Sequence, residues 1–259
     1  MTAGQRDTAR RPPVAIVTGA AGLIGSAVCE VLSSAGSEVV AIDAKPTEVA
    51  NVVSVVADVC DRAGLDGVAR DIDARYGYAD YLIHAAALTG RSPLLPLDVT
   101  LTDIDLEAWD RVLRVNLTAA LACVQSFIGL LRRSDSARIL FFGSIQGAVP
   151  TLGSGAYSVS KTGLIGLTRQ LAAELAVEGI RVNMISPGPV ANRPTRAQGP
   201  GLPETHRLTP LGRRASPMEV AGAVHHLMSD AFDYMTGMDV HLDGGEHLRP
   251  RYSPPPVSS

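Results

Sequence analysis

The sequence predicts an α/β fold: a doubly wound parallel sheet of about seven strands with helices on both faces. Two observations support this prediction. Short runs rich in β-branched residues alternate with longer segments of helical periodicity, and the first such run leads into a glycine-rich turn and a helix. The alternation continues without a break from residue 14 to residue 245, which predicts a single domain over residues 13–248.

The expected strands are mostly apolar, as in a sheet that is buried on both faces. In such sheets, ligands bind beyond the carboxyl ends of the strands, where the strand order reverses. Helical periodicity is clearest over Leu23–Ala35, Asp105–Leu131, Tyr157–Val177 and Pro217–Ser229. The strands are expected at Val14–Thr18, Val39–Asp43, Val52–Asp58, Tyr81–Ala87, Arg138–Gly143, Arg181–Ser186 and Met238–Leu242.

The composition excludes several classes of function. With 46% hydrophobic residues in a chain of 259, a large buried core is expected. The formal charge of −3 and the lack of a long basic cluster argue against nucleic acid as a partner. The cysteines Cys29, Cys60 and Cys123 are far apart and form no C-x-x-C pair, which indicates a reducing compartment.

The two ends of the chain differ in composition from the rest. Residues 1–12 are polar and carry arginines without a following apolar stretch, so they do not resemble a secretory signal. Residues 249–259 are rich in proline and serine, and both ends are expected to be flexible. The longest apolar run, Ala119–Leu131, is too short to cross a bilayer. A cytoplasmic protein without a membrane partner is therefore expected.

Three glycines, Gly19, Gly22 and Gly25, lie in the turn between the first strand and the first helix. Glycines allow a tight turn and a close approach of the backbone to a ligand. The N–H groups of this turn, including those of Leu23 and Ile24 at the helix N-terminus, can therefore face a pyrophosphate. The alternative is that the glycines only tighten a strand-to-helix connection.

Carboxylates end the next two expected strands. Asp43 lies eighteen residues after Gly25, where a carboxylate binds the ribose hydroxyls of a dinucleotide and repels a 2′-phosphate. Asp58 can accept a hydrogen bond from the adenine amino group. This combination predicts a Rossmann-like fold that binds a dinucleotide, and it favours NAD(H) over NADP(H) as the cofactor.

Tyr157 and Lys161 are four residues apart in an expected helix, and Ser144 lies thirteen residues before the tyrosine. Residues i and i+4 share a helix face, so the lysine ammonium is expected to lower the pKa of the phenol from about 10. Tyr157 would then act as a general acid/base, and Ser144 would hydrogen-bond the substrate oxygen. The alternative is that the tyrosine and the lysine are ordinary helix-surface residues.

In combination, these motifs resemble those of the short-chain dehydrogenase/reductase family, from Val14 to Gly245. The segment 212–245 is typical of the compact, single-domain members of that family. The resemblance implies hydride transfer with a nicotinamide cofactor. The other matching segments are the TGAAGLIG turn, Asp58-Val59, Asn116 in RVNLTAAL, Ser144 in FFGS, YSVSK at 157–161 and SPGPV at 186–190.

The resemblance implies a role for each matching residue. Tyr157 would move the proton, Ser144 would polarise the substrate oxygen, and Lys161 would bind the nicotinamide ribose and tune the tyrosine. Asn116 would hold a water molecule that links Lys161 to a proton relay. Further cofactor contacts would come from Val59, Ala85, Ala86, Ala87, Pro187, Gly188 and Val190.

Two segments depart from the compact pattern. Leu23 lies where compact members usually have the middle glycine, and His84-Ala85-Ala86-Ala87 replaces the usual Asn-Asn-Ala-Gly. Both features are typical of the family's extended branch, which acts on nucleotide sugars and carries a further carboxyl-terminal substrate domain. A chain of 259 residues leaves no room for that domain, so a compact architecture is expected.

Two long connections, 88–104 and 189–211, are expected to form walls of the substrate pocket. In the second, Arg193 or Arg196 is expected to meet a polar or anionic group of the substrate. The alternative for this second connection is disorder without a role.

The histidines of the carboxyl-terminal part are interpreted as packing or surface residues, and no metal site is predicted. No H-x-x-x-H pair with a nearby carboxylate appears in the sequence. These histidines are His225, His226, His241 and His247.

The candidate residues predict an NAD(H)-dependent oxidoreductase that interconverts a secondary alcohol and a ketone, acting on a small molecule. Two alternatives stay open: a nucleotide-sugar epimerase or dehydratase that uses bound NAD, and a non-catalytic dinucleotide sensor. Relatives pair the helices expected at 105–131 and 157–177 between subunits, so the resemblance implies a homodimer or homotetramer.

Overall fold

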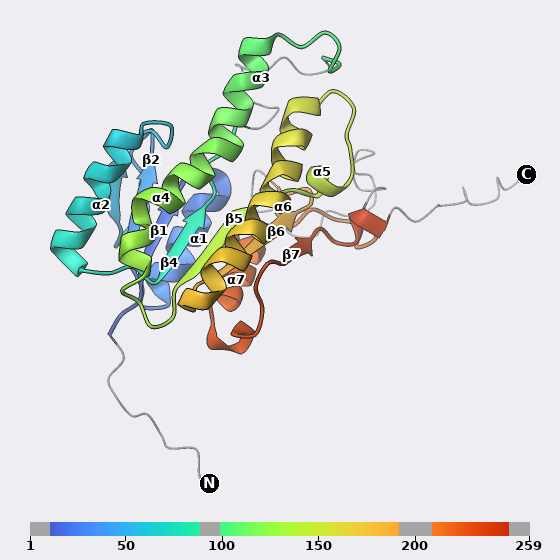
Figure 1. Ribbon diagram of the computed structural model, residues 1–259. Helices are drawn as coiled ribbons and strands as arrows, with labels where there is room; N and C mark the ends of the chain where they lie inside the picture. The colour runs from blue at the N-terminus through green and yellow to red at the C-terminus, as the bar shows by residue number, and fades with distance from the viewer. Residues whose placement is uncertain (1–10, 89–98, 192–208, 249–259) are drawn as a thin grey trace, which may run out of the picture.

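The computed structural model describes residues 11–88, 99–191 and 209–248. Across these residues the chain forms a seven-stranded sheet in the order β3-β2-β1-β4-β5-β6-β7, and every neighbouring pair is parallel (Figure 1). The predicted fold class is confirmed. The strands are β1 (Val14–Thr18), β2 (Glu38–Asp43), β3 (Val53–Val56), β4 (Tyr81–His84), β5 (Arg138–Phe142), β6 (Arg181–Pro187) and β7 (Asp239–Leu242).

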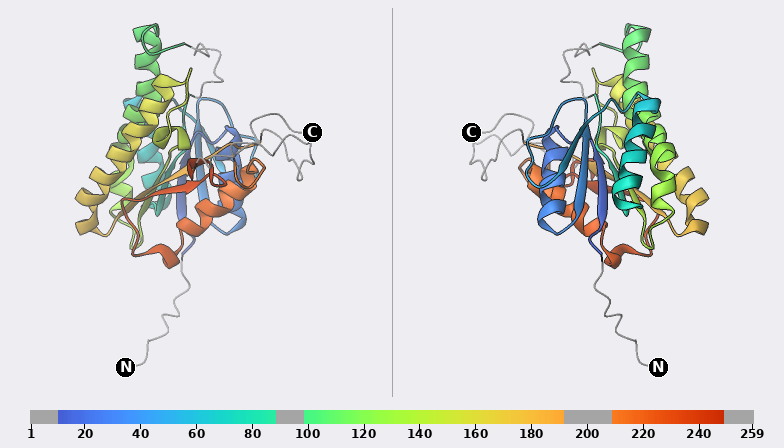
Figure 2. Two further views of the ribbon diagram at one scale, coloured as in Figure 1. Left: turned by 90° about the vertical axis from the view of Figure 1, so that its right-hand side faces the viewer. Right: turned by 90° about the vertical axis from the view of Figure 1, so that its left-hand side faces the viewer.

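Helices cover both faces of the sheet (Figure 2). One hydrophobic cluster joins the sheet to α2, α4 and α6, and a second joins its other face to α1 and α7. The α-helices are α1 (Leu23–Ser34), α2 (Arg62–Tyr76), α3 (Leu106–Leu113), α4 (Ala119–Leu131), α5 (Ile145–Ala148), α6 (Gly155–Leu175) and α7 (Pro217–Leu227). Shorter helical turns are the π-helix η1 (Arg114–Thr118) and the 3-10 helices η2 (Ala176–Glu178), η4 (Asp230–Phe232) and η5 (Glu246–Leu248).

The sequence of β1 illustrates how the sheet is stabilised. Its residues, VAIVT, are all buried, and small or β-branched side chains pack well on a pleated surface that is covered on both faces. Val14 and Ile16 pack in the cluster with α2, α4 and α6, whereas Ala15 and Val17 pack in the cluster with α1 and α7. Each fully buried valine or isoleucine contributes about 1.5–3 kcal/mol.

The helix expected at Asp105–Leu131 is found as α3, η1 and α4 in direct succession. This continuous stretch, Leu106–Leu131, is long and apolar enough to cross a membrane by length and composition, with a mean hydropathy of 1.4 in its most apolar window. Its α4 part buries Cys123, Phe127 and Leu131 against the sheet. We therefore interpret it as a core helix.

Several expected boundaries shift. The strands expected to reach Asp58 and Ala87 end at Val56 and His84, and the Asp58 carboxylate instead accepts a hydrogen bond from the Cys60 amide (2.9 Å) in the turn before α2. At the amino-terminal end, the Pro12 carbonyl accepts a hydrogen bond from Tyr78 (2.9 Å), so residue 12, which was expected to be flexible, makes a specific contact.

Other expectations concern parts of the chain that lie outside the described residues. These are the flexibility of residues 1–10 and 249–259 and the substrate contacts of Arg193 and Arg196.

Candidate active site

The glycine turn lies at the point where the strand order reverses. β1 and β4 are adjacent, β2 and β3 extend the sheet to one side, and β5 to β7 extend it to the other. Gly19 has a φ of +71° and packs so closely on the backbone of Ala85 and Ala86 that a Cβ atom would overlap it. A Cβ atom on Gly25 would collide with the Gly19 carbonyl oxygen. Only glycine allows this close packing.

The N-terminus of α1 is suited to an anion. Gly22 precedes the helix, and within the described residues no side chain caps it. The first-turn N–H groups of Leu23, Ile24 and Gly25 lack carbonyl partners within the helix, as at every helix N-terminus, so they can donate to a pyrophosphate.

Asp43 is held beside this turn. One carboxylate oxygen accepts a hydrogen bond from the Ala21 amide (3.0 Å), and the other accepts one from the Lys45 amide (3.1 Å). A hollow of about 1040 Å³ next to it is lined by Ala21, Ser26, Lys45 and Thr47, among others. The glycine turn, the helix N-terminus and this carboxylate fit a dinucleotide, with the pyrophosphate at α1 and a ribose at Asp43.

Ser144 and Tyr157 come together beyond the end of β5. Ser144 is the N-cap of α5 and accepts a hydrogen bond from the Gln146 amide (3.2 Å), while Tyr157 lies in the first turn of α6. The Ser144 hydroxyl lies near enough to the Tyr157 phenol to interact with it. Burial raises the pKa of Tyr157 above its ordinary value of 10, and the interaction with Ser144 opposes that rise.

Lys161 lies one turn after Tyr157 and is almost completely buried. Its Nζ donates a hydrogen bond to the Phe142 carbonyl (2.7 Å) and is 5.6 Å from the centroid of the Tyr157 ring. Burial lowers the pKa of Lys161 to about 7. The sequence predicts that the ammonium lowers the pKa of Tyr157. The pKa of the phenol instead shifts upwards, because loss of solvent disfavours the charged form of each group.

Asn116 connects the end of β4 to α6 from the π turn η1. Its Oδ1 accepts a hydrogen bond from the Leu88 amide (2.7 Å), and its Nδ2 donates to the Leu88 carbonyl (3.0 Å) and to Ser160 Oγ (3.0 Å). Ser160 in turn donates to the Tyr157 carbonyl (2.7 Å). The side chain of Asn116 therefore links the end of β4 to α6, and the water molecule that it is expected to hold stays a prediction.

His84 is buried and lies near Lys161. The sequence alone predicts no chemical role for this histidine. Its Nδ1 is 2.9 Å from the hydroxyl of Thr18, and the ring packs edge-on against Phe141. Burial, aided by the charge of Lys161, lowers the pKa of His84 to about 3, so the ring is neutral at physiological pH. The departure from Asn-Asn-Ala-Gly marks this position in the sequence, but its burial follows only from the fold.

The remaining candidates also lie beyond the strand ends. Pro187 is the last residue of β6, Gly188 packs against Asp243, and Val190 forms a bridge with Ala215. Ala85 continues from β4, its amide donating to the Thr18 carbonyl (3.1 Å). The described candidate residues are thus distributed along the edge at which the parallel strands end.

Comparison with known proteins gives a consistent picture. Residues 19–247 match the family model described as enoyl-(acyl carrier protein) reductase. The chain is 30% identical over 248 residues to the 3-oxoacyl-[acyl-carrier-protein] reductase of Escherichia coli, covering 91% of this chain and 97% of that one. It is 35% identical over 247 residues to a cis-4-hydroxycyclohexanecarboxylate dehydrogenase of Sinomonas cyclohexanicum, covering 90% and 95%.

Solved structures lead to the same family. An aldohexose dehydrogenase of Thermoplasma acidophilum superposes with a TM-score of 0.83 at 25% identity, over 95% of this chain and 98% of that one. A short-chain dehydrogenase/reductase of Serratia marcescens superposes with a TM-score of 0.80 at 28% identity, over 91% and 98%. The chain therefore belongs to the short-chain dehydrogenase/reductase family.

As a short-chain dehydrogenase/reductase, the chain is an oxidoreductase that uses a nicotinamide cofactor. The matches cover nearly the full length of its relatives, which confirms the compact type. The extended-type glycine spacing is thus a local variation in a compact member of the family.

Proposed function

We propose that the protein is an NAD(H)-dependent oxidoreductase that interconverts a secondary alcohol and a ketone. The observation that supports this most directly is the proximity of Ser144 to Tyr157, which opposes the rise of the Tyr157 pKa, beside the buried Lys161 at the carboxyl ends of the strands. A hydroxyl donor next to a phenol is suited to bind one substrate oxygen and to transfer a proton to or from it.

The nicotinamide would supply or accept the hydride at the substrate carbon. In reduction, Tyr157 gives its proton to the carbonyl oxygen while Ser144 donates a hydrogen bond to the same oxygen. The raised pKa of Tyr157 keeps this proton in place at neutral pH. In oxidation the phenolate accepts the alcohol proton, and a charged Lys161 favours that form. Lower pH therefore favours reduction, and higher pH favours oxidation.

The preference for NAD(H) rests on Asp43. Its carboxylate is held at the glycine turn by the amides of Ala21 and Lys45. In that place it can accept hydrogen bonds from the ribose hydroxyls, and it would repel a 2′-phosphate. The adenine would contact Asp58 and Val59, and the nicotinamide would lie near Pro187, Gly188 and Val190.

We propose a small secondary alcohol or ketone that carries a polar or anionic group as the substrate class. The name of the Sinomonas relative describes a hydroxycyclohexane with a carboxylate, and that protein is 35% identical to this chain. A carboxylate on the substrate would be met by Arg193 or Arg196. Substituting each arginine by glutamine should then raise KM for hydroxy acids and leave KM for uncharged alcohols unchanged.

The experiment for the proposed activity is a screen of secondary alcohols and ketones with NAD(H) and NADP(H), followed by cofactor absorbance at about 340 nm. Tyr157→Phe should reduce turnover by about 10²–10⁴-fold while cofactor affinity stays the same, because only the proton-transfer group is lost. Tyr234→Phe is the control, since that tyrosine is fully exposed on the surface. Turnover by Tyr157→Phe equal to that of the control would contradict the assignment.

The same screen distinguishes the proposed oxidoreductase from the alternative function, a nucleotide-sugar epimerase or dehydratase. The glycine spacing and His84-Ala85-Ala86 are features of the branch that acts on nucleotide sugars. A nucleotide-sugar epimerase or dehydratase would convert its substrate without net consumption of cofactor. Conversion of a nucleotide sugar without a change in absorbance would therefore favour this second function.

We also propose a homodimer or homotetramer in the cytoplasm. The apolar side chains of Leu121 on α4 and Val159 on α6 are exposed, at 37% and 40%, on the two helices that relatives pair between subunits. Sedimentation of only a 27.1 kDa species would contradict the oligomer.

A further inference from the structure

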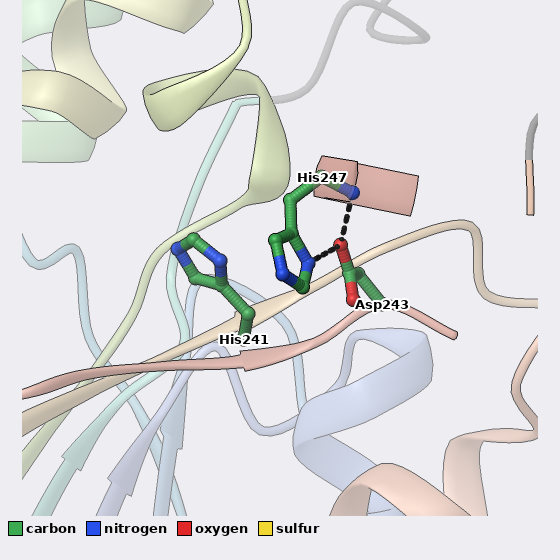
Figure 3. Close-up of side chains that lie close together, drawn as sticks. All are labelled: His241, Asp243 and His247. Carbon is green, nitrogen blue, oxygen red and sulfur yellow. Dashed lines mark hydrogen bonds and ion pairs between the residues drawn. The ribbon is translucent and has the colours of Figure 1, made fainter. Parts of the chain in front are cut away.

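Two histidines and an aspartate from one short segment come together at the end of β7 (Figure 3). His241 lies on β7, Asp243 follows the strand, and His247 lies on η5. One atom from each side chain that could bind a metal lies within 4.8 Å of those of the other two. The ring of His247 lies between the other two side chains, with its centroid 5.0 Å from that of His241.

The arrangement is held by hydrogen bonds around Asp243. One of its carboxylate oxygens is 2.8 Å from Nδ1 of His247 and accepts the His247 amide at 2.6 Å. The other accepts the Gly245 amide at 3.0 Å. Asp243 is almost completely buried, whereas His247 is 37% exposed. The cluster is thus fixed on one side and open to solvent on the other.

Asp239 orients the second histidine. Its carboxylate is 3.3 Å from Nε2 of His241 and also accepts a hydrogen bond from Ser186 (2.6 Å). When Nε2 donates to this carboxylate, Nδ1 of His241 carries the lone pair that can bind a metal ion. A carboxylate behind a histidine is the usual support of a metal ligand, since it fixes the tautomer and the direction of the ring.

The charge of this region also favours a cation. Asp239 and Asp243 are largely buried, and within the described part of the chain their ion pairs are with His241 and His247 and not with a lysine or an arginine. Buried carboxylates require a compensating positive charge or hydrogen bonds. A divalent ion would supply that charge for both of them.

We propose that His241, Asp243 and His247 bind a divalent transition-metal ion of the zinc type. Two imidazoles and a carboxylate are a common ligand set for this ion, with bonds of about 2.0–2.2 Å. Tetrahedral bonds of that length place ligand atoms about 3.3 Å apart. Modest side-chain rotations bring the atoms to this spacing from within 4.8 Å. Three protein ligands leave the fourth position for water or for an oxygen atom of another molecule.

The site lies next to the proposed catalytic centre. Asp243 packs directly against Gly188, and η5 packs against α5, the helix that begins after Ser144. β7 and β6 are neighbours, with Ser186 opposite His241. The metal ion would therefore stabilise the segment that joins β7 to the wall of the crevice, independently of the reaction assigned to the enzyme.

Calorimetric titration of tag-free protein with ZnCl₂ alone tests the proposal, with metal content measured after dialysis. One ion should bind per chain. His241→Ala and His247→Ala should each weaken binding at least about tenfold, and Asp239→Asn should weaken it by about tenfold by releasing the His241 ring. His225→Ala and His226→Ala remove another pair of close histidines, with rings 5.6 Å apart on α7, and should leave binding unchanged.

Absence of stoichiometric binding would overturn the proposal. Equal affinity in the wild type and in His247→Ala would overturn it too, since the ion would then bind elsewhere, for example at a cysteine. Because His247 is exposed, the His247→Ala variant is expected to fold. A measurement of its cofactor affinity checks that it does. If His241→Ala fails to fold, the zinc affinity of His247→Ala alone decides the proposal.

Discussion

The buried histidine at the end of β4 makes the stability of the protein sensitive to mild acid. His84 has its pKa lowered from the ordinary value of 6.5 to about 3, mainly by burial and further by Lys161. The unfolded chain therefore binds a proton at this histidine between those pH values, whereas the folded chain does not. The contribution of His84 to folding stability is therefore fully present above about pH 6.5 and is lost as the pH falls towards 3.

The size of the effect follows from the two pKa values. Each pH unit below 6.5 costs about 1.4 kcal/mol as long as the folded pKa is not reached. Between about pH 8 and about pH 5, His84 should therefore remove about 2 kcal/mol of the free energy of unfolding.

The assay is urea unfolding at both pH values for the wild type and for His84→Asn, at one protein concentration. Substitution by asparagine changes the absolute stability, but the measured quantity is the difference between the two pH values. That difference should be about 2 kcal/mol smaller in the variant, whereas His226→Asn, at an exposed position, should behave like the wild type. Parallel pH dependence of the wild type and His84→Asn would refute the reasoning.

Three further predictions concern the cofactor site and its support. Asp43→Asn should lower the ratio of NAD(H) to NADP(H) affinity by about tenfold in fluorescence titrations, since the charge that repels a 2′-phosphate is removed; an unchanged ratio would contradict the role of Asp43. Gly25→Ala should weaken cofactor binding at least about tenfold, because the new methyl group collides with the Gly19 carbonyl. Gly222→Ala is the control, since its new methyl group meets no atom within 4 Å. This variant should bind the cofactor normally and gain up to about 1 kcal/mol of stability. Asn116→Ala should cost about 1–3 kcal/mol in urea unfolding and also reduce turnover, because it leaves both backbone groups of Leu88 without their partner. Loss of activity without loss of stability would indicate a direct chemical role for Asn116.

Much of the fold could be predicted from the sequence because its signals are local. A strand buried on both faces, such as β1, is an unbroken apolar run, and here it lies between Pro13 and Gly19. The expected ends of β3 and β4 lie beyond the observed ends. After β4, the small apolar residues Ala85, Ala86 and Ala87 continue the apolar pattern past the strand. Composition does not distinguish a strand residue from a small residue that lines a ligand site.

The candidate site could be predicted in part for the same reason. Tyr157, Lys161 and Ser144 were found by spacing, and the structure brings Ser144 and Tyr157 into contact. The direction of the Tyr157 pKa shift was not predictable, because it depends on how completely the fold removes water from both groups. The relation of His241 to Asp239 could have been predicted, since residues two apart on a strand share a face. The position of His247 depends on the turn that follows.

The π turn at Asn116 has a consequence for how this chain can change in length. Each residue of an α-helix advances the rotation by about 100°, and a π turn adds one residue to a single turn. α3 packs against α6 and α4 packs against α2, so the two halves of one helix serve different neighbours in a fixed rotational relation. Deletion of one residue from Arg114–Thr118 would convert the π turn into an ordinary α turn and largely keep this relation, whereas deletion of one residue within α4 would rotate its two sides by about 100° against each other. The π turn is therefore the place in this long helix where the loss of one residue is best tolerated, provided that Asn116 keeps its hydrogen bonds to Leu88.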